Sequence, residues 1–259
     1  MITLANKTLL IDLDGTMYRG NRVIPEAITF IQRLQKHHVP YVFVTNNATR
    51  TPKQNVDHMK SLGFTGIKPE AFFTSAMAAV AHMKRISKAE KVFCIGEAGL
   101  QEAVAQGGYQ IDEEGAELVF VGLDRYADFS LYSRAARCLR HNHALLVGTN
   151  GDRRVPDGDS FFIGNGAVLE MLQYASEVER INIGKPSSIM MEETLAYIGR
   201  QAGECIVLGD NLETDITFGK HNGVMTIMVT SGVHTRTDAE RCKVQPDILI
   251  DSLDELHIK

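Results

Sequence analysis

The chain has 259 residues, 44% of them hydrophobic and 23% charged, which is typical of a globular protein with one large domain or two modest ones. Its formal net charge of −5 argues against nucleic-acid binding, which usually requires a basic patch. No C-x-x-C pair, membrane-length apolar stretch or signal-peptide pattern is evident, so we expect reduced thiols and a cytoplasmic protein without a membrane partner.

Short apolar runs alternate with helical patterns along the whole chain. Pro25 suits the first turn of a helix, and Thr51-Pro52 predicts an N-cap followed by a first-turn proline. Strands are expected at 8–13, 41–44, 91–95, 117–121, 144–148, 180–183, 204–208, 225–229 and 247–250. Helices are expected at 25–36, 51–62, 75–85, 99–106, 130–140, 167–175, 187–201 and 213–221.

This alternation predicts α/β architecture with parallel sheets and helical crossovers. About ten strands are many for one sheet of ordinary size, so two α/β domains are expected. We expect the pairs Met190-Met191 and Phe161-Phe162 to be packing residues.

Four polar clusters follow predicted strands directly. They are Asp12-Leu13-Asp14-Gly15-Thr16, Thr45-Asn46-Asn47, Gly184-Lys185-Pro186 and Gly209-Asp210-Asn211-Leu212-Glu213-Thr214-Asp215. In open parallel sheets, ligands bind beyond the carboxyl ends of the strands, so the four clusters can meet at one site.

The residue types in these clusters indicate a particular chemistry. Carboxylates without histidine or cysteine favour a hard cation, Mg²⁺ before Zn²⁺. A hard cation, a lysine and small polar donors together suit a phosphoryl group. A carboxylate beside the metal can then act as a covalent nucleophile.

The four motifs, in this order, resemble those of the haloacid dehalogenase (HAD) superfamily, most closely its subfamily IIA of NagD-like, p-nitrophenylphosphatase-type enzymes. The resemblance covers essentially the whole chain. It implies a doubly wound, Rossmann-like parallel-sheet core and a Mg²⁺-dependent phosphomonoesterase. The substrate would be a small phosphorylated metabolite, such as a sugar phosphate or a nucleoside monophosphate, with p-nitrophenyl phosphate as a substrate in vitro.

The resemblance also implies residue roles. Asp12 resembles the nucleophile that becomes an aspartyl-phosphate, and Asp14 the general acid and base. Asp12, Asp14 and Asp210 resemble the metal ligands, with Asp14 expected to contribute its backbone carbonyl. Lys185 resembles the cation that holds the phosphate. The remaining implied members are phosphate-binding Thr45, Asn46 and Asn47 and supporting Asp215, Gly209 and Asn211.

The same family accounts for the length of chain between the second and third motifs. An inserted α/β cap of the C2 type is expected at 80–179, with the core at 1–79 and 180–259. Such a cap would select the leaving group, and residues 149–152 and the following loop are its expected contributors. A homodimer formed through the cap is a further implication.

Other interpretations remain open from the sequence. Asp12 and Asp14 are also compatible with turn residues after a strand, although the three further clusters argue against this. A phospho-receiver signalling domain also places an aspartate at a strand end, and a non-catalytic binding protein could use the same core. His234 follows a core strand and is a further candidate for the mouth of the site.

Overall fold

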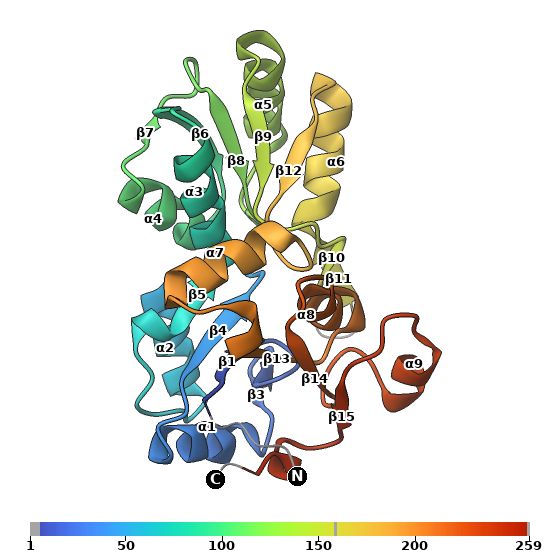
Figure 1. Ribbon diagram of the computed structural model, residues 1–259. Helices are drawn as coiled ribbons and strands as arrows, with labels where there is room; N and C mark the ends of the chain where they lie inside the picture. Colours follow the sequence, from blue (N-terminus) through green and yellow to red (C-terminus); the bar gives the residue numbers. More distant parts are fainter. Residues whose placement is uncertain (1–5, 158–159, 258–259) are drawn as a thin grey trace. The chain divides into compact units, whose positions relative to one another are not determined.

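The computed structural model describes residues 6–157 and 160–257, which fold into two compact units (Figure 1). Unit 1 combines the described residues up to Thr45, Pro52–Phe73 and those from Thr194 onward. Unit 2 consists of Asn46–Thr51 and Thr74–Glu193. Unit 2 therefore extends beyond the predicted cap, 80–179, on both sides. No helix among the described residues is long and apolar enough to cross a bilayer.

Unit 1 is built on a six-stranded sheet with the order β15-β14-β13-β1-β4-β5. Its strands are β1 (Thr8–Ile11), β4 (Tyr41–Thr45), β5 (Phe72–Thr74), β13 (Cys205–Gly209), β14 (Met225–Val229) and β15 (Ile248–Ile250). β1 pairs in parallel with β4 and with β13, and β13, β14 and β15 continue the parallel pairing. The predicted doubly wound parallel sheet is therefore confirmed.

The central strands of unit 1 are apolar because both faces of the sheet are covered. All of β1 and all of β13 are buried, as expected for inner strands of a parallel sheet. The helices are α1 (Ala27–Lys36), α2 (Pro52–Ser61), α7 (Ser188–Ile198, which begins in unit 2), α8 (Thr217–His221) and α9 (Arg236–Arg241). Short helical turns lie at η1 (Pro69–Ala71), η2 (Ala202–Glu204), η3 (Leu212–Ile216) and η4 (Leu253–Glu255). The buried pair Met190 and Met191 on α7 confirms the packing role expected for it.

A small hairpin follows β1, at a place where no strand was predicted from the sequence. It consists of β2 (Tyr18–Arg19) and β3 (Arg22–Val23), paired so that Arg19 faces Arg22. The turn before it is fixed by a 2.7 Å hydrogen bond that the Gly15 amide donates to the Tyr18 carbonyl. We call this element the flap hairpin.

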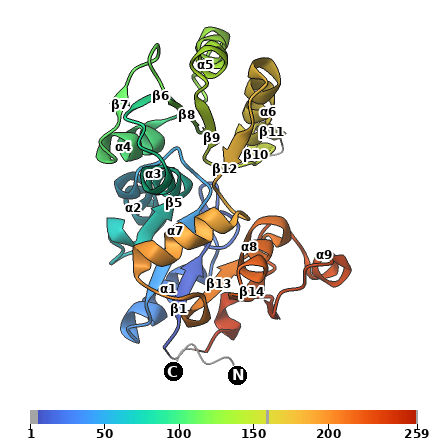
Figure 2. The same ribbon diagram turned by 45° about the horizontal axis from the view of Figure 1, so that its top comes forward.

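Unit 2 has its own five-stranded sheet with the order β12-β9-β8-β6-β7, and all of its pairings are parallel. The strands are β6 (Lys91–Ile95), β7 (Gln110–Ile111), β8 (Leu118–Val121), β9 (Leu145–Gly148) and β12 (Arg180–Asn182). Its helices are α3 (Ser75–Ile86), α4 (Ala98–Gln106), α5 (Phe129–Asn142) and α6 (Asn165–Ser176). Phe93, Val119 and Leu146 pack with α5 and α6 on one face, while α3 and α4 lie on the other (Figure 2).

A second hairpin in unit 2 corrects one sequence expectation. β10 (Arg154–Asp157) and β11 (Ser160–Ile163) form a separate antiparallel pair. Phe161 is 55% exposed and Phe162 46% exposed, so the interpretation of this pair as packing residues was wrong. The alternation of β11 places the two rings on opposite faces of the ribbon, and all four residues of β11 are exposed.

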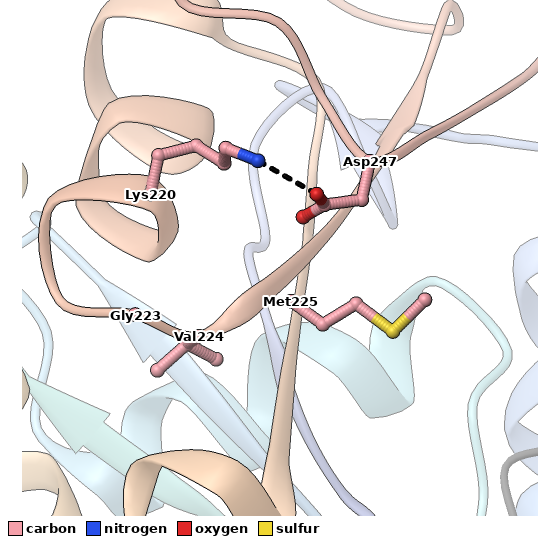
Figure 3. A pocket seen from close by; sticks show the side chains of 5 residues that line it. All are labelled: Lys220, Gly223, Val224, Met225 and Asp247. Atoms are coloured by element: carbon pink, nitrogen blue, oxygen red, sulfur yellow. Dashed lines mark hydrogen bonds and ion pairs between the residues drawn. The ribbon is translucent and has the colours of Figure 1, made fainter.

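The amino end of the unit 1 sheet carries an open pocket of 370 Å³, lined by Lys220, Gly223, Val224, Met225 and Asp247 (Figure 3). Lys220 Nζ and Asp247 Oδ1 are 2.6 Å apart. The other Asp247 oxygen accepts hydrogen bonds from the amide and the hydroxyl of Thr226. The polar groups of this pocket thus tie α8 to β14, at the edge opposite the predicted site.

Candidate functional site

Two adjacent strands bring the first and last polar clusters together in unit 1. The parallel register aligns Ile11 of β1 with Leu208 of β13, and the Asp12 amide continues the ladder with a 2.9 Å hydrogen bond to the Leu208 carbonyl. Within the unit 1 sheet, the next strand along the chain after β1 is β4, on one side, and the next after β13 is β14, on the other. This is the switch point at which parallel α/β sheets bind ligands.

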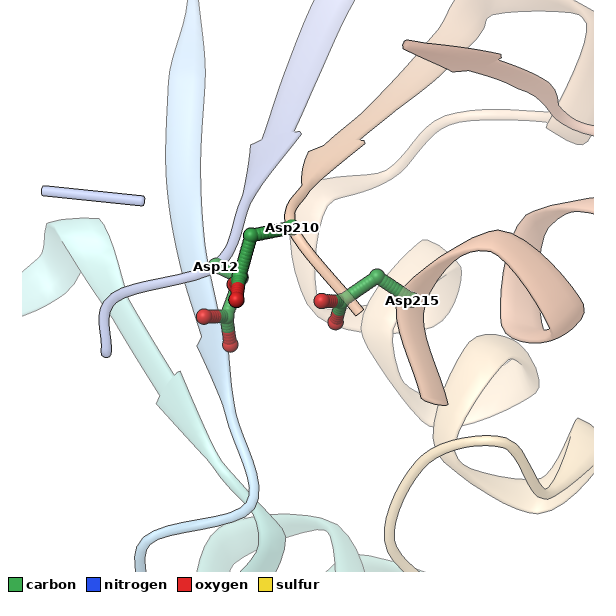
Figure 4. A group of neighbouring side chains, drawn as sticks. All are labelled: Asp12, Asp210 and Asp215. Atoms are coloured by element: carbon green, nitrogen blue, oxygen red, sulfur yellow. The ribbon is translucent and has the colours of Figure 1, made fainter. Parts of the chain in front are cut away.

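Three carboxylates converge at this point (Figure 4). Asp12, Asp210 and Asp215 each offer an oxygen, and these oxygens all lie within 4.8 Å of one another. Asp210 and Asp215 are each only 1% exposed, and Asp12 is half-buried. Carboxylates this close and this buried repel one another strongly unless a cation lies among them. The set contains only oxygen donors, so it fits a hard divalent cation.

The backbone around Asp215 allows its carboxylate to lie close to those of Asp12 and Asp210. A Cβ on Gly209 would lie 2.4 Å from the Asp215 Cβ, so only glycine at the end of β13 leaves room for this approach. Asn211 caps the following turn, since its side-chain oxygen accepts hydrogen bonds from the amides of Glu213 and Thr214. The Asn211 amide in turn donates to Asp215 Oδ2 at 3.2 Å. Gly209 and Asn211 thus support the site through its backbone.

The segment that carries Asp215 departs from the predicted α-helix over 213–221. Leu212–Ile216 is a π-helical turn, and the α-helix begins only at Thr217. The Asn211 carbonyl accepts hydrogen bonds from the amides of both Asp215 and Ile216. Wide turns of this kind often occur at functional sites, and here the turn holds Asp215 beside Gly209.

Asp14 and Thr45 belong to the same edge of the unit 1 sheet. Asp14 is exposed and forms an isolated bridge with Tyr18, at the base of the flap hairpin. Thr45 is the last residue of β4 and is 5% exposed. Because β4 is the other neighbour of β1, Thr45 ends the strand that lies beside the one Asp12 follows.

The remaining predicted residues gather within unit 2. Asn46 Nδ2 donates to Asp152 Oδ1 at 3.2 Å and to the Lys185 carbonyl at 3.1 Å. Lys185 is 4% exposed, and Asn47 Oδ1 accepts hydrogen bonds from the amide and hydroxyl of Thr49. The second and third motifs are therefore joined directly, and both Nδ2 hydrogens of Asn46 are engaged inside unit 2.

The expected cap contributor Asn150 is a structural support of this cluster. It is 5% exposed, and its Nδ2 donates to the Asn46 carbonyl at 2.8 Å. The Asn150 carbonyl accepts a 3.0 Å hydrogen bond from Asn165 at the start of α6. Asn165 and Asn150 thus connect α6 to the Asn46 loop, a link that no sequence signal indicated.

Two models of known protein families match segments of this chain. Residues 9–110 match the family model of haloacid dehalogenase-like hydrolases, and residues 182–256 match a second model of HAD-like hydrolases. The chain belongs to the haloacid dehalogenase superfamily. The two matched segments contain all four predicted motifs.

Individual HAD relatives cover nearly the whole chain. The 5'-nucleotidase YutF of Bacillus subtilis is 38% identical over 249 residues, covering 96% of each chain. An acid sugar phosphatase of Staphylococcus epidermidis is 34% identical over 238 residues, covering 92% of this chain and 91% of its own. The structure of NagD from E. coli K-12 superimposes with a TM-score of 0.89 at 27% identity and covers 97% of this chain and 98% of its own. The protein is thus a HAD phosphatase of the NagD-like type.

Proposed function

We propose that this HAD phosphatase is a Mg²⁺-dependent phosphomonoesterase that acts through an aspartyl-phosphate on Asp12. The observation that supports this most is the convergence of Asp12, Asp210 and Asp215 at the switch point of the unit 1 sheet. Asp12 is the most accessible of the three and is therefore the member best suited to meet a substrate.

Mg²⁺ is the cation that best fits the donors. Asp12, Asp210 and the backbone carbonyl of Asp14 would hold it, and Asp215 would support it. When bound, the ion neutralises charge on the phosphate and on Asp12. Without such neutralisation, an anionic nucleophile would be repelled by an anionic phosphate ester.

The proposed reaction has two steps. In the first, an Asp12 carboxylate oxygen forms a bond to phosphorus while the bond to the ester oxygen breaks, and Asp14 gives its proton to the leaving oxygen. In the second, Asp14 takes a proton from a water molecule that attacks phosphorus, and the bond to Asp12 breaks to release inorganic phosphate. Asp14 ends the cycle in its starting protonation state.

Thr45, Asn46, Asn47 and Lys185 are proposed to bind the phosphate. Because both Nδ2 hydrogens of Asn46 are engaged by Asp152 and Lys185, Asn46 would contribute through its backbone amide. Lys185 would offset the negative charge that Asp12 and the phosphate bring together.

The substrate is proposed to be a small phosphate ester, such as a nucleoside monophosphate or a sugar phosphate. The relatives named as a 5'-nucleotidase and an acid sugar phosphatase support these two classes. Residues 80–179, all within unit 2, are proposed to be the C2 cap that selects between them.

We further propose that the protein forms a homodimer through this cap and that it is cytoplasmic. The location is supported by the four cysteines, which are free thiols in this structure.

Replacement of Asp12 by asparagine tests the nucleophile. We expect Asp12→Asn to lower the turnover of p-nitrophenyl phosphate by more than about a thousandfold, because the covalent route is lost. Exposed Asp57 on α2 provides the matched control, and Asp57→Asn should retain wild-type turnover. Retained activity in Asp12→Asn would refute the assignment of the nucleophile.

The same assay tests the metal requirement. EDTA should abolish wild-type turnover, and added Mg²⁺ should restore it. Full activity in EDTA would refute Mg²⁺ dependence. Absence of turnover with added Mg²⁺ would refute the proposed phosphomonoesterase activity.

A further inference from the structure

The loop that follows β14, residues 231–234, packs against the carboxylate of Asp210. We call it the Asp210 loop. The Val233 amide donates a 2.6 Å hydrogen bond to Asp210 Oδ2. From the other side, the Thr16 hydroxyl donates to Asp210 Oδ1 at 3.1 Å. Each oxygen of this buried carboxylate is therefore held by its own donor, from two segments far apart in the sequence.

Two glycines allow the backbone to pack closely against the same carboxylate. A Cβ on Gly232 would lie 1.8 Å from Asp210 Oδ2, and a Cβ on Gly15 would lie 2.3 Å from that oxygen. Gly15 also has a φ of +98°, which favours glycine independently of the available space. The position of Asp210 thus depends on where the backbone at Gly232 lies.

Arg19 of the flap hairpin fixes that backbone. Its Nη2 donates to the carbonyls of Ser231 and Gly232, the latter at 3.0 Å. The Ser231 hydroxyl completes the connection with a 2.8 Å hydrogen bond to the Gly15 carbonyl. Arg19, the turn at Gly15 and the Asp210 loop therefore form one connected arrangement around Asp210.

We propose that Arg19 is a positioning residue that sets the Mg²⁺ affinity of this site through the Asp210 loop. The inference rests on the proposed role of Asp210 as a metal ligand. Arg19 itself does not bind the metal; it holds the loop whose amide orients Asp210 Oδ2. Groups that orient a metal ligand commonly change metal affinity about 10–100-fold when they are removed. Because Arg19 contacts the loop and not Asp210 itself, its effect should be smaller, and its loss should weaken Mg²⁺ binding about 3- to 10-fold.

The direction in which Mg²⁺ affinity changes when Arg19 is replaced distinguishes a positioning role from a direct electrostatic effect of its charge. Removing a positive charge from the neighbourhood of a cation site should strengthen cation binding by Coulomb's law. Positioning predicts the opposite, because the carboxylate loses its orientation. Arg22 supplies the matched control, since it is the cross-strand partner of Arg19 in the flap hairpin and is exposed.

The test measures Mg²⁺ dissociation constants of Arg19→Ala, Arg19→Lys and Arg22→Ala by calorimetric titration of the full chain without substrate. Arg19→Ala should bind Mg²⁺ about 3- to 10-fold more weakly than wild type, and Arg22→Ala should bind it equally or more tightly. Arg19→Lys should recover part of the loss, because its ammonium group can still donate to a carbonyl. With p-nitrophenyl phosphate, the Mg²⁺ concentration for half-maximal activity of Arg19→Ala should rise, while kcat at saturating Mg²⁺ should return toward wild type.

Two outcomes would overturn the inference: unchanged or tighter Mg²⁺ binding in Arg19→Ala, or an equal loss in Arg22→Ala. Asp210→Asn tells this failure apart from failure of the proposed function. If Asp210→Asn loses Mg²⁺ binding and Arg19→Ala does not, only the role of Arg19 is refuted. If Asp210→Asn binds Mg²⁺ as wild type does, the proposed metal site is itself refuted.

Discussion

At the scale of single residues, the site depends on how closely backbone can approach a carboxylate. Asp210 is buried, and its two oxygens accept hydrogen bonds from Thr16 and Val233. A buried carboxylate that lost these donors would carry an uncompensated desolvation cost. The glycines that allow this packing are thus as important to the geometry as the acidic residues themselves.

A change at Gly232 should therefore displace Asp210. Gly232→Ala would place a methyl group 1.8 Å from Asp210 Oδ2, so either the carboxylate or the loop must move. We expect Mg²⁺ affinity to fall at least about tenfold, as for other losses of ligand orientation. Calorimetric titration of the purified variant measures this directly.

Gly203 provides the control for the glycine-to-alanine change. A Cβ there meets nothing within 4 Å, and its φ is not positive. Gly203→Ala should leave Mg²⁺ affinity unchanged and stabilise the fold by about 0.4–1 kcal/mol through the unfolded chain. Equal Mg²⁺ affinities for the Gly232 and Gly203 variants would contradict the packing argument.

At the scale of elements, side chains at strand and helix ends connect segments that the sequence separates. Asn165 at the start of α6 donates to the carbonyls of Val121 and Asn150, and Asn150 donates to the carbonyl of Asn46. Asn46 then donates to the carbonyl of Lys185. Three asparagines in series thus link β8, β9 and α6 to the loop that precedes α7.

Loss of Asn150 should loosen the proposed phosphate-binding residues without unfolding unit 2. Asn150→Ala removes the 2.8 Å hydrogen bond to the Asn46 carbonyl. We expect inorganic phosphate, measured as a competitive inhibitor, to bind about 5- to 10-fold more weakly, since a hydrogen bond contributes on the order of 1 kcal/mol. The effect should appear in the inhibition constant and in KM.

Asn142 is the corresponding control within unit 2. Its Nδ2 also donates to backbone carbonyls, those of Glu114 and Ala116, at the end of α5. Asn142→Ala should change the thermal midpoint and leave phosphate inhibition at the wild-type value. If both variants weaken phosphate equally, the asparagine series has no specific role in holding the phosphate-binding residues.

The elements that the sequence predicted correctly are those with strong local signals. The buried run of β1 and the proline at the start of α2 can be recognised from a few neighbouring residues. The flap hairpin has two residues in each strand, too few for any periodicity. The π-helical turn at Leu212–Ile216 was predicted only as part of a helix, because the wide hydrogen bond from the Ile216 amide to the Asn211 carbonyl has no residue pattern of its own.

The residues of the site likewise include some that the sequence predicted and some that it did not. The acidic and lysine-containing motifs stood out because polar residues directly follow apolar strands. Arg19 gave no such signal, because its partners Ser231 and Gly232 lie more than 200 residues away and are backbone carbonyls. The further candidate His234 proves to be an acceptor, its Nδ1 receiving a 3.2 Å hydrogen bond from the Leu212 amide. A backbone carbonyl can accept a hydrogen bond whatever its residue type, so the sequence does not reveal such long-range contacts.

At the scale of the whole molecule, each unit has a hydrophobic core of its own. In unit 1 the core includes Leu9, Phe30 and Ile206, and in unit 2 it includes Phe93, Val119 and Leu139. The three converging carboxylates all belong to unit 1. A ligand that binds only the folded form stabilises the elements that build its site.

Mg²⁺ should therefore slow hydrogen exchange selectively in unit 1. At 100 times the dissociation constant, one bound ion contributes about 2.7 kcal/mol, so amides that exchange only when the site opens should slow about 100-fold. The expected peptides cover residues 9–17, 205–216 and 229–234, whereas α5 in unit 2 should be unaffected. Exchange measured by mass spectrometry with and without Mg²⁺ tests this, with Asp210→Asn as the variant that should lose the response. Equal slowing of α5 would mean that the ion stabilises both units together, and no slowing at residues 205–216 would contradict a metal site built by Asp210 and Asp215.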